Sequence, residues 1–228
     1  MLRMKYPDDY INKIICGDCL EVMKDIPDKS VDLVLTDPPY GKRKDIKWDN
    51  KDNFISKIDL WFNEFFRISK YGIIIFCADS MIHHLLKNRE HFYQRLLIWN
   101  KPAGSQFKGA CNNNLWFSIE LILVFSQDYE NLKKNYEKNI EYSYQFFNAR
   151  TIPSKKYGHP ITKPIELMRW LILHFTKNNQ IILDSFLGSG TTAVACKELG
   201  RNYIGIEISP EYCEIARKRI NSITGKLF

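Results

Sequence analysis

The sequence of 228 residues lacks several features that mark common protein classes. No stretch approaches the roughly 18 uninterrupted apolar residues of a membrane span. Residues 1–8 are charged and contain no apolar segment of the kind found in signal peptides. We also find no internal repeat and no low-complexity tract. We therefore expect a soluble, intracellular protein with a cytoplasmic location.

Cysteine is present but does not form the pattern of a disulfide framework. Most of the six cysteines lie inside apolar segments, which favours reduced and largely buried thiols. Cys16 and Cys19 form a C-x-x-C, yet no second Cys or His pair lies at zinc-finger spacing. We therefore expect no metal site.

The charge balance is basic, with 33 Lys and Arg against 26 Asp and Glu, a formal charge of +7 and a pI near 9.0. This balance favours a polyanionic partner such as nucleic acid, although many basic proteins never bind DNA. With 45% apolar residues, the chain can bury one sizeable core but would be cramped as two domains. We expect a single domain over residues 1–228.

The pattern of apolar segments predicts an α/β fold. Seven short segments rich in Ile, Leu and Val are predicted to be strands: 14–16, 31–36, 72–78, 94–100, 118–125, 180–184 and 202–208. Helical periodicity predicts six helices: 19–25, 54–69, 80–90, 165–175, 191–199 and 210–223. Alternating strands and helices favour a mostly parallel seven-stranded sheet with helices on both faces. The segments 94–100 and 118–125 have no convincing helix between them, which predicts an antiparallel hairpin at the sheet edge.

A glycine-containing loop, Asp184-Ser-Phe-Leu-Gly-Ser-Gly-Thr-Thr192, follows a predicted strand and opens a predicted helix. Gly188 and Gly190 allow a ligand to approach backbone N–H groups in the tight turn. Gly188-x-Gly190-x-x-Ala193 also fits the dinucleotide fingerprint, and Glu207 ends the next strand, where a ribose-binding acid belongs. The loop by itself fits NAD as well as S-adenosylmethionine, and glycines that serve packing alone are a further alternative. A P-loop is excluded because no Gly-Lys-Ser/Thr follows.

A second motif, Asp37-Pro38-Pro39-Tyr40, ends the predicted strand 31–36. Proline restricts its own φ and the conformation of the residue before it, so these side chains point in fixed directions. One interpretation is a strand ended by a Pro-Pro turn with a surface tyrosine.

The functional interpretation is methylation of an amino group of a nucleic acid base. Such an amine is a poor nucleophile because its lone pair is delocalised into the ring. The Asp37 carboxylate and the Pro38 carbonyl can accept hydrogen bonds from the amine and localise that lone pair. Tyr40 can stack on a base flipped out of the duplex. Positioning then accounts for much of the catalysis, without a metal or a covalent intermediate.

Four ordered motifs together resemble those of the amino-group DNA methyltransferases, specifically the circularly permuted beta group. The catalytic motif Asp37-Pro38-Pro39-Tyr40 comes first and the cofactor motif Phe186-Leu-Gly-Ser-Gly190 comes last. Gly17-Asp18-Cys19-Leu20 and Gly158-His-Pro-Ile-Thr-Lys-Pro164 also match that group, so the similarity extends from about residue 13 to residue 220.

The resemblance implies a Rossmann-like methyltransferase domain that uses S-adenosylmethionine. Asp18 and Cys19 would border the adenine of the cofactor, Glu207 would bind its ribose, and the turn 186–192 would hold its methionine part. The implied cofactor-binding residues are Asp18, Cys19, Asp37, Lys163, Phe186, Gly188, Ser189, Gly190, Thr191, Thr192 and Glu207. Lys163 could reach the cofactor carboxylate or be a solvated lysine at a helix start, and Asp18 could also be a helix N-cap.

The basic loop 41–51 follows the catalytic motif directly and predicts contacts with the phosphates of double-stranded DNA. Its candidate DNA-binding residues are Lys42, Arg43, Lys44 and Lys47. The alternative is a solvated loop. Residues 101–157 include the polar, aromatic and basic segments 104–114 and 127–157, which we expect to contain target-recognition loops, although asparagines are equally ordinary in turns.

The resemblance implies a site-specific DNA methyltransferase of a restriction-modification type. Adenine N6 is the preferred acceptor because members with Asp before the prolines lean toward adenine, and cytosine N4 is the alternative. RNA is a smaller alternative as substrate. An NAD-dependent oxidoreductase would leave residues 37–40 without a role, and a noncatalytic DNA-binding module would leave the cofactor loop unexplained. A homodimer and a cognate restriction endonuclease are candidate partners.

Overall fold

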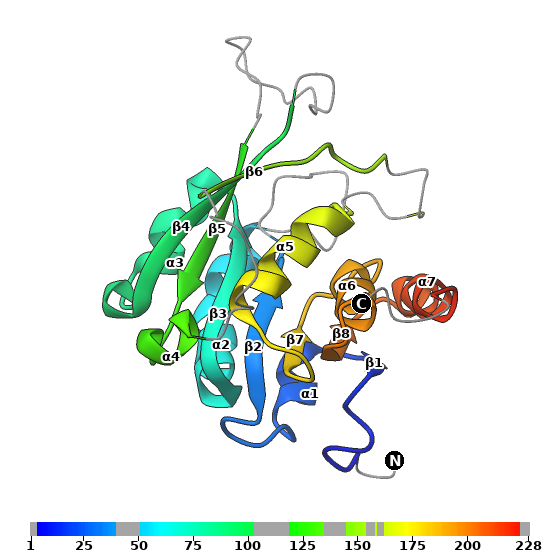
Figure 1. The fold of residues 1–228 in the computed structure, drawn as a ribbon. Helices are drawn as coiled ribbons and strands as arrows, with labels where there is room; N and C mark the ends of the chain where they lie inside the picture. Colours follow the sequence, from blue (N-terminus) through cyan, green and yellow to red (C-terminus); the bar gives the residue numbers. More distant parts are fainter. Residues whose placement is uncertain are drawn as a thin grey trace.

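The fold is seen in a computed structural model that describes residues 4–39, 51–102, 119–134, 145–153, 158 and 162–223, with side chains from residue 54 onward in the second range. Within these residues the chain forms one twisted sheet with helices on both faces (Figure 1). The α/β class predicted from the sequence is confirmed.

The sheet holds eight strands within the described residues, in the order β1-β8-β7-β2-β3-β5-β4-β6. The strands are β1 (Lys13–Cys16), β2 (Val31–Thr36), β3 (Ser69–Cys77), β4 (Tyr93–Asn100), β5 (Ile119–Phe125), β6 (Phe146–Asn148), β7 (Ile181–Asp184) and β8 (Asn202–Glu207). Of these, β5 alone runs antiparallel to its neighbours β3 and β4, and the other pairings are parallel. The carboxyl ends of seven strands therefore meet at one edge of the sheet.

The helices are α1 (Cys19–Met23), α2 (Lys51–Ile68), α3 (Ile82–Leu86), α4 (Tyr129–Lys133), α5 (Ile165–Phe175), α6 (Thr191–Glu198) and α7 (Pro210–Asn221). Two short 3₁₀ turns, η1 (Asp79–Met81) and η2 (Glu90–Phe92), flank α3. Asp18 caps α1 and Ser209 caps α7 through their side chains, and Gly200 after α6 has a φ of 70°. The N-cap role that the sequence allows for Asp18 is confirmed.

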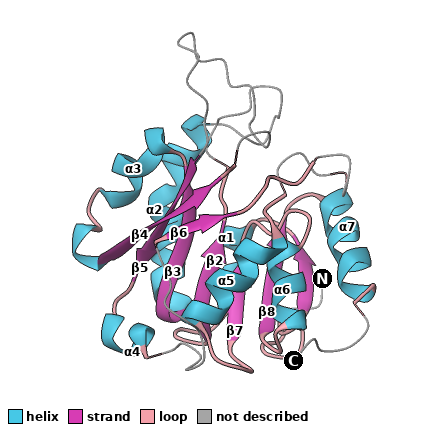
Figure 2. Cartoon of the chain, turned by 45° about the horizontal axis from the view of Figure 1, so that its top comes forward, coloured by secondary structure: helices cyan, strands magenta, loops and turns pink. Residues whose placement is uncertain are grey.

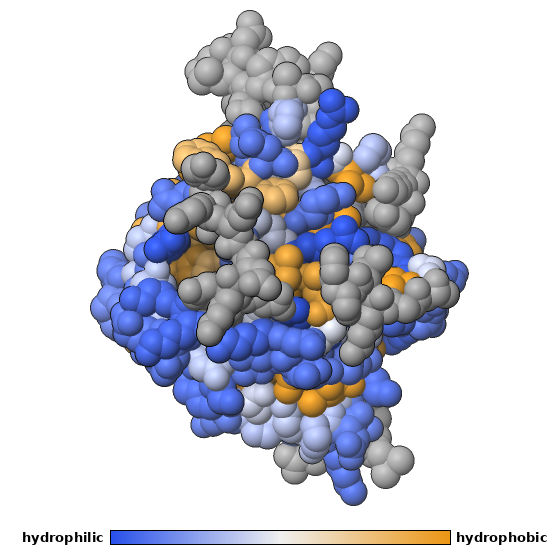
Figure 3. All heavy atoms as spheres, in the orientation of Figure 1, coloured by the Kyte–Doolittle hydropathy of each residue, from blue (hydrophilic) through white to orange (hydrophobic). Residues whose placement is uncertain are grey.

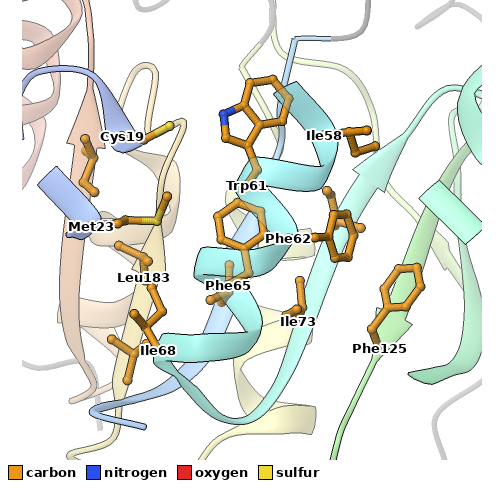
Figure 4. Close-up of a cluster of buried hydrophobic side chains, with 14 of the residues drawn as sticks. Cys19, Met23, Ile58, Trp61, Phe62, Phe65, Ile68, Ile73, Phe125 and Leu183 are labelled. Atoms are coloured by element: carbon orange, nitrogen blue, oxygen red, sulfur yellow. The ribbon is translucent and has the colours of Figure 1, made fainter. Parts of the chain in front are cut away.

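The core divides into two layers because neighbouring strand residues face opposite sides of the sheet. In β3, Ile73 and Ile75 lie in one cluster and Ile74 and Phe76 in the other. The first cluster packs against α1 and α2, and Figure 4 shows Trp61, Phe65 and other side chains of α2 directed into it. The second cluster packs against α5, α6 and α7, with α5 and α6 on the near side of the sheet in Figure 2.

Three details of the predicted fold are wrong. The sheet has an eighth strand, β6, which pairs in parallel with β4, so the β4–β5 hairpin does not form the edge. Its three residues are too few to show an alternating pattern. The predicted helix 80–90 is instead η1, the short α3 and η2, and α4 forms inside a segment predicted to be loop.

The outer surface is mixed. On the face shown in Figure 3, hydrophilic side chains cover most of the described surface and hydrophobic ones gather in separate patches, as is ordinary for proteins. Within the described part of the chain, no helix combines the length and apolar character needed to cross a membrane.

Candidate active site

A pocket opens at the carboxyl edge of the sheet, where β7 and β2 are neighbours. From β7 the chain passes through α6 to β8, and from β2 it passes through α2 to β3, so the two connections diverge. Such a switch point leaves a crevice in which open α/β sheets bind ligands. The lining comes from both loops and their surroundings: residues 17–19, 37–39, 57, 61, 162–163, 168, 184–189, 191–192, 207–208 and 212.

The loop after β7 depends on two glycines in the left-handed region. Gly188 has a φ of 53° and Gly190, the N-cap of α6, has a φ of 86°. A Cβ on Gly190 would lie 2.7 Å from the Cβ of Ala216 in α7, which is closer than real atoms approach. Glycine at 190 is therefore required for packing as well as conformation, and Gly190 supports the pocket without lining it.

Glu207 ends β8 and closes one side of the pocket. Its two carboxylate oxygens accept hydrogen bonds from the backbone N–H groups of Gly188 and Ser209, each at 2.8 Å. Burial raises the pKa of this carboxyl above its ordinary value, although these N–H donors oppose the shift. Glu207, which the sequence predicted as the ribose-binding acid, is thus hydrogen-bonded to the predicted glycine loop.

Arg219 from α7 braces the same loop and was not predicted. Its Nη1 donates to the carbonyl of Ser189 at 2.6 Å, to the Ser189 hydroxyl at 2.9 Å and to the Thr191 hydroxyl at 3.2 Å. The Thr162 hydroxyl lies 3.1 Å from the Ser189 hydroxyl on the other side. The hydroxyls of Ser189 and Thr191 are consequently hydrogen-bonded to other residues of the protein, and both residues also line the pocket.

Asp184 lines the pocket and hydrogen-bonds both to the end of β2 and to the loop after β7. Its carboxylate accepts from the hydroxyls of Thr36 at 2.9 Å and Thr192 at 2.5 Å and from the backbone N–H of Phe186 at 3.1 Å. Burial raises the pKa of Asp184 to about 6, although these hydrogen bonds oppose the shift. The only signal for this role in the sequence was its place at the end of a strand.

Asp37 is held by a buried lysine. The Lys163 ammonium contacts Asp37 Oδ2 and lies 3.0 Å from Glu120 Oε1, and the Lys163 side chain is 6% exposed. The interpretation of Lys163 as a solvated lysine is therefore wrong. Its ammonium already binds two carboxylates, and Lys163 also lines the pocket, so contact with a cofactor carboxylate stays a prediction.

The far side of the pocket comes from α1 and α2. Asp18 Oδ1 accepts from the N–H of Leu20 at 2.9 Å, which confirms its N-cap role, while Oδ2 lies 3.8 Å from the Lys57 ammonium. Trp61 packs edge-on against Phe186, with ring centroids 4.9 Å apart. Lys57 and Trp61 were missed because their helix shows only ordinary amphipathic spacing.

The structure brings together the predicted residues that it describes. All of them line the pocket except Gly190: Asp18, Cys19, Asp37, Pro38, Pro39, Lys163, Phe186, Gly188, Ser189, Thr191, Thr192 and Glu207. Tyr40 and the basic residues Lys42, Arg43, Lys44 and Lys47 lie outside the described residues, as does the predicted recognition segment 104–114. The segment 127–157 is described in part and contains α4 and β6.

The charges of the pocket suit an uncharged or cationic ligand. Four carboxylates line it, those of Asp18, Asp37, Asp184 and Glu207, and both lining lysines are paired with them. A pyrophosphate would meet this acidic surface, which argues against a dinucleotide. The apolar lining from Trp61, Phe186 and Ile208 and the carboxylate of Glu207 fit an adenosine group whose ribose hydroxyls donate.

Comparisons with known proteins show which family the chain belongs to. A sequence model described as DNA methylase matches residues 31–218. The chain is 32% identical to the type II methyltransferase M.HinfI of Haemophilus influenzae, over 95% of this chain and 70% of that protein.

Solved structures of DNA methyltransferases have a similar fold. The M1.HpyAVI–SAM complex superposes with a TM-score of 0.72 at 28% identity, over 92% of this chain and 98% of that one. The PvuII DNA methyltransferase, which is cytosine-N4-specific, has a TM-score of 0.72 at 17% identity over 92% of this chain and 87% of its own, and it supports the fold alone. Pocket, motifs and matches agree that the chain belongs to the DNA methylase family of N6 and N4 amino-methyltransferases.

Proposed function

We propose that this DNA methyltransferase transfers a methyl group to N6 of adenine at a specific DNA sequence, with Asp37 as the residue that binds the target amino group. The observation that carries the proposal is the place of Asp37, at the end of β2, on the pocket wall and with its carboxylate bound by Lys163. The cofactor is S-adenosylmethionine, which supplies an electrophilic methyl group on a cationic sulfur.

The chain's own residues fit that cofactor. Glu207 would accept from its ribose hydroxyls, and Asp18 and Cys19 would border its adenine. The N-terminus of α6, opened by Thr191 and Thr192, favours the carboxylate of its methionine part. The carboxylates of Asp37 and Asp184 favour a cationic sulfur nearby.

Asp37 and Pro38 would prepare the amino group for attack. A hydrogen bond from the amine to the Asp37 carboxylate and another to the Pro38 carbonyl would pull the amine toward tetrahedral geometry. The lone pair would then be localised toward the methyl group. Because Pro38 and Pro39 restrict the backbone, little rearrangement is needed at the moment of transfer. Tyr40 would stack on the flipped base.

Adenine is preferred because Asp stands before the two prolines, whereas members acting on cytosine N4 more often carry Ser there. The same two acceptors could hold either amine. Cytosine N4 therefore stays the alternative acceptor, and the modified base decides between them.

DNA would be held in part by the basic segment 41–51, with Lys42, Arg43, Lys44 and Lys47 on phosphates. Neutralising Lys42, Arg43 and Lys44 together should weaken DNA binding and flatten its salt dependence. An unchanged salt slope would contradict this role. We keep a homodimer and a cognate restriction endonuclease as proposed partners.

The product identifies the acceptor. Plasmid DNA treated with the protein and S-adenosylmethionine would be digested to nucleosides and analysed by mass spectrometry, and single-molecule sequencing would map the modified positions. We expect N6-methyldeoxyadenosine within one recurring sequence. N4-methylcytosine would reject adenine, and methylation without a recurring sequence would reject site specificity.

A further inference from the structure

Four alternating charges form a chain that ends on Asp37. Lys163 binds Asp37 and lies 3.0 Å from Glu120 Oε1, and the Lys101 ammonium lies 2.8 Å from Glu120 Oε2. The order of charges is therefore negative, positive, negative, positive. The four residues come from separate elements: the end of β2, the segment before α5, β5, and the end of β4.

The inner members of this chain are buried. The side chains of Glu120 and Lys101 are each 10% exposed and that of Lys163 is 6% exposed, against 24% for Asp37. The two ammoniums lie near aromatic rings, Lys163 at 4.9 Å from the centroid of Phe76 and Lys101 at 4.6 Å from that of Trp99. Asp37 is thus the most exposed of the four side chains, and Asp37 and Lys163 line the pocket whereas Glu120 and Lys101 do not.

Glu120 and Lys163 stay ionised at neutral pH. Burial opposes ionisation of Glu120, but the Lys163 and Lys101 ammoniums outweigh burial and lower its pKa to about 2. Burial would also lower the pKa of Lys163, and Asp37 and Glu120 instead raise it. Since burying an ion costs several kcal/mol, each of these charges depends on its neighbours.

We infer that Glu120 is a positioning residue for methyl transfer, which holds the Lys163 ammonium so that Lys163 orients the Asp37 carboxylate toward the target amino group. The inference rests on the proposed role of Asp37. Lys163 by itself has three donors on a flexible stem and could follow Asp37 into several positions. Glu120 fixes the ammonium from the protein side.

Glu120 also balances charge. A Lys163 ammonium that lacked Glu120 as its second partner would weaken the Asp37 carboxylate as an acceptor. Asp37 and Glu120 carry two negative charges against the two positive charges of Lys163 and Lys101, so the four residues have no net charge. Replacing Glu120 by a neutral residue leaves a net positive charge against the reacting groups.

The test is Glu120→Gln, which keeps the side-chain shape and removes the charge. We expect the single-turnover rate of methyl transfer to DNA to fall about 10- to 100-fold, as for a misplaced catalytic group. The Kd values for S-adenosylmethionine and DNA should stay within about threefold of wild type, because Glu120 does not line the pocket. A wild-type rate would overturn the inference, and so would a rate loss matched by an equal loss of cofactor binding.

Glu198→Gln is the matched control. Glu198 is 12% exposed and pairs with Arg169 at 2.7 Å, and neither residue lines the pocket. It should lose stability and keep the transfer rate, so an equal rate loss in this variant would overturn the inference.

Glu120→Asp keeps the charge and carries the test if the Gln variant does not fold. Its shorter side chain cannot span both lysines, so we expect a smaller rate loss with unchanged Kd values, and a wild-type rate would again overturn the inference. Asp37→Ala separates the two proposals. If Asp37→Ala still transfers methyl groups, the role of Asp37 fails, whereas loss in Asp37→Ala with full activity in both Glu120 variants rejects the positioning role alone.

Discussion

The two loops that form the pocket are held by different means. The loop after β7 is fixed by backbone conformation and by hydrogen bonds to neighbouring elements: Gly188 to Glu207, Leu187 to Ile206, and Arg219 to Ser189. The loop after β2 presents Asp37, whose carboxylate is held by the ammonium of Lys163, 126 residues away in sequence.

This difference matches the task proposed for each loop. A cofactor loop must keep one shape for a ligand that is the same in every cycle, and rigid backbone achieves that. A catalytic carboxylate needs orientation and charge at the same time, and a buried ion pair supplies both. Changes in the two loops should therefore produce separable losses, of binding in one and of rate in the other.

Asp37→Ala should give the largest effect, a loss of methyl transfer that leaves the loop after β7 unchanged. We expect the rate of methyl transfer to fall about 10³-fold or more, because the amine would keep only the Pro38 carbonyl as an acceptor. The Kd for S-adenosylmethionine, measured by calorimetry, should rise by a far smaller factor than the rate falls, because Asp37 is one of several pocket residues proposed to bind the cofactor. Asp28→Ala is the control, since Asp28 is 74% exposed. Substantial turnover in Asp37→Ala would refute the assigned role.

Gly190→Ala should break the cofactor loop. The new Cβ would meet Ala216 and the φ of 86° would be strained, so the free energy of unfolding should fall by about 2 kcal/mol. S-adenosylmethionine should bind about tenfold more weakly, a loss of about 1.4 kcal/mol. Gly200→Ala is the matched control, with a φ of 70° and no place in the pocket. It should lose stability and keep cofactor affinity, and equal weakening in both variants would contradict this account.

Asp184, which joins the loops, should make stability depend on pH. Its pKa is raised from 3.8 to about 6 in the folded protein, so the folded state binds the proton more tightly than the unfolded state. The penalty for its charge is present above pH 6 and is relieved as pH falls toward 4. Wild type should therefore gain about 1 kcal/mol relative to Asp184→Asn between pH 7 and pH 5. Parallel denaturation curves with no pH-dependent difference would contradict the raised pKa.

Lys57→Met should give the smallest effect, and it tests whether Lys57 contributes to cofactor binding or to the transfer rate. Lys57 lies 3.8 Å from Asp18 and is 37% exposed, so their interaction is weak. We expect the Kd for S-adenosylmethionine to rise about threefold or less, with the transfer rate at saturation unchanged. Lys24→Met removes an exposed lysine that pairs with Glu21 at 2.8 Å and should change neither value. A tenfold loss of rate in Lys57→Met would show that Lys57 belongs to the catalytic side.

Local signals in the sequence predicted the cofactor side well. Residues 180–184 read as a strand, glycines at 188 and 190 as a tight turn, and residues 191–199 as a helix, and all three form there. Glu207 was placed by its position at the end of the next strand. Each of these signals lies within a few residues of the feature it predicts.

Sequence signals for β6, for the ion pairs of Glu120 and for the contacts of Arg219 were weak or absent. β6 has three residues and pairs with β4 only in the assembled sheet. Glu120 lies in a strand whose other residues are mostly apolar, so its charge had no visible partner in sequence. Arg219 looked like one of many basic residues on a terminal helix, yet it donates to Ser189 and Thr191.

The sequence by itself determined the class of fold, the glycine turn and the stiff Asp37-Pro38-Pro39 segment, because these depend on apolar periodicity and on the backbone limits of glycine and proline. Only the tertiary structure decided which charges meet. The partners of Asp37, Glu120 and Lys163 are far apart along the chain, and folding of the sheet brings them to one edge and removes them from water. In that setting the charges of an ion pair interact more strongly than in water, and no local pattern in the sequence shows which charges will pair.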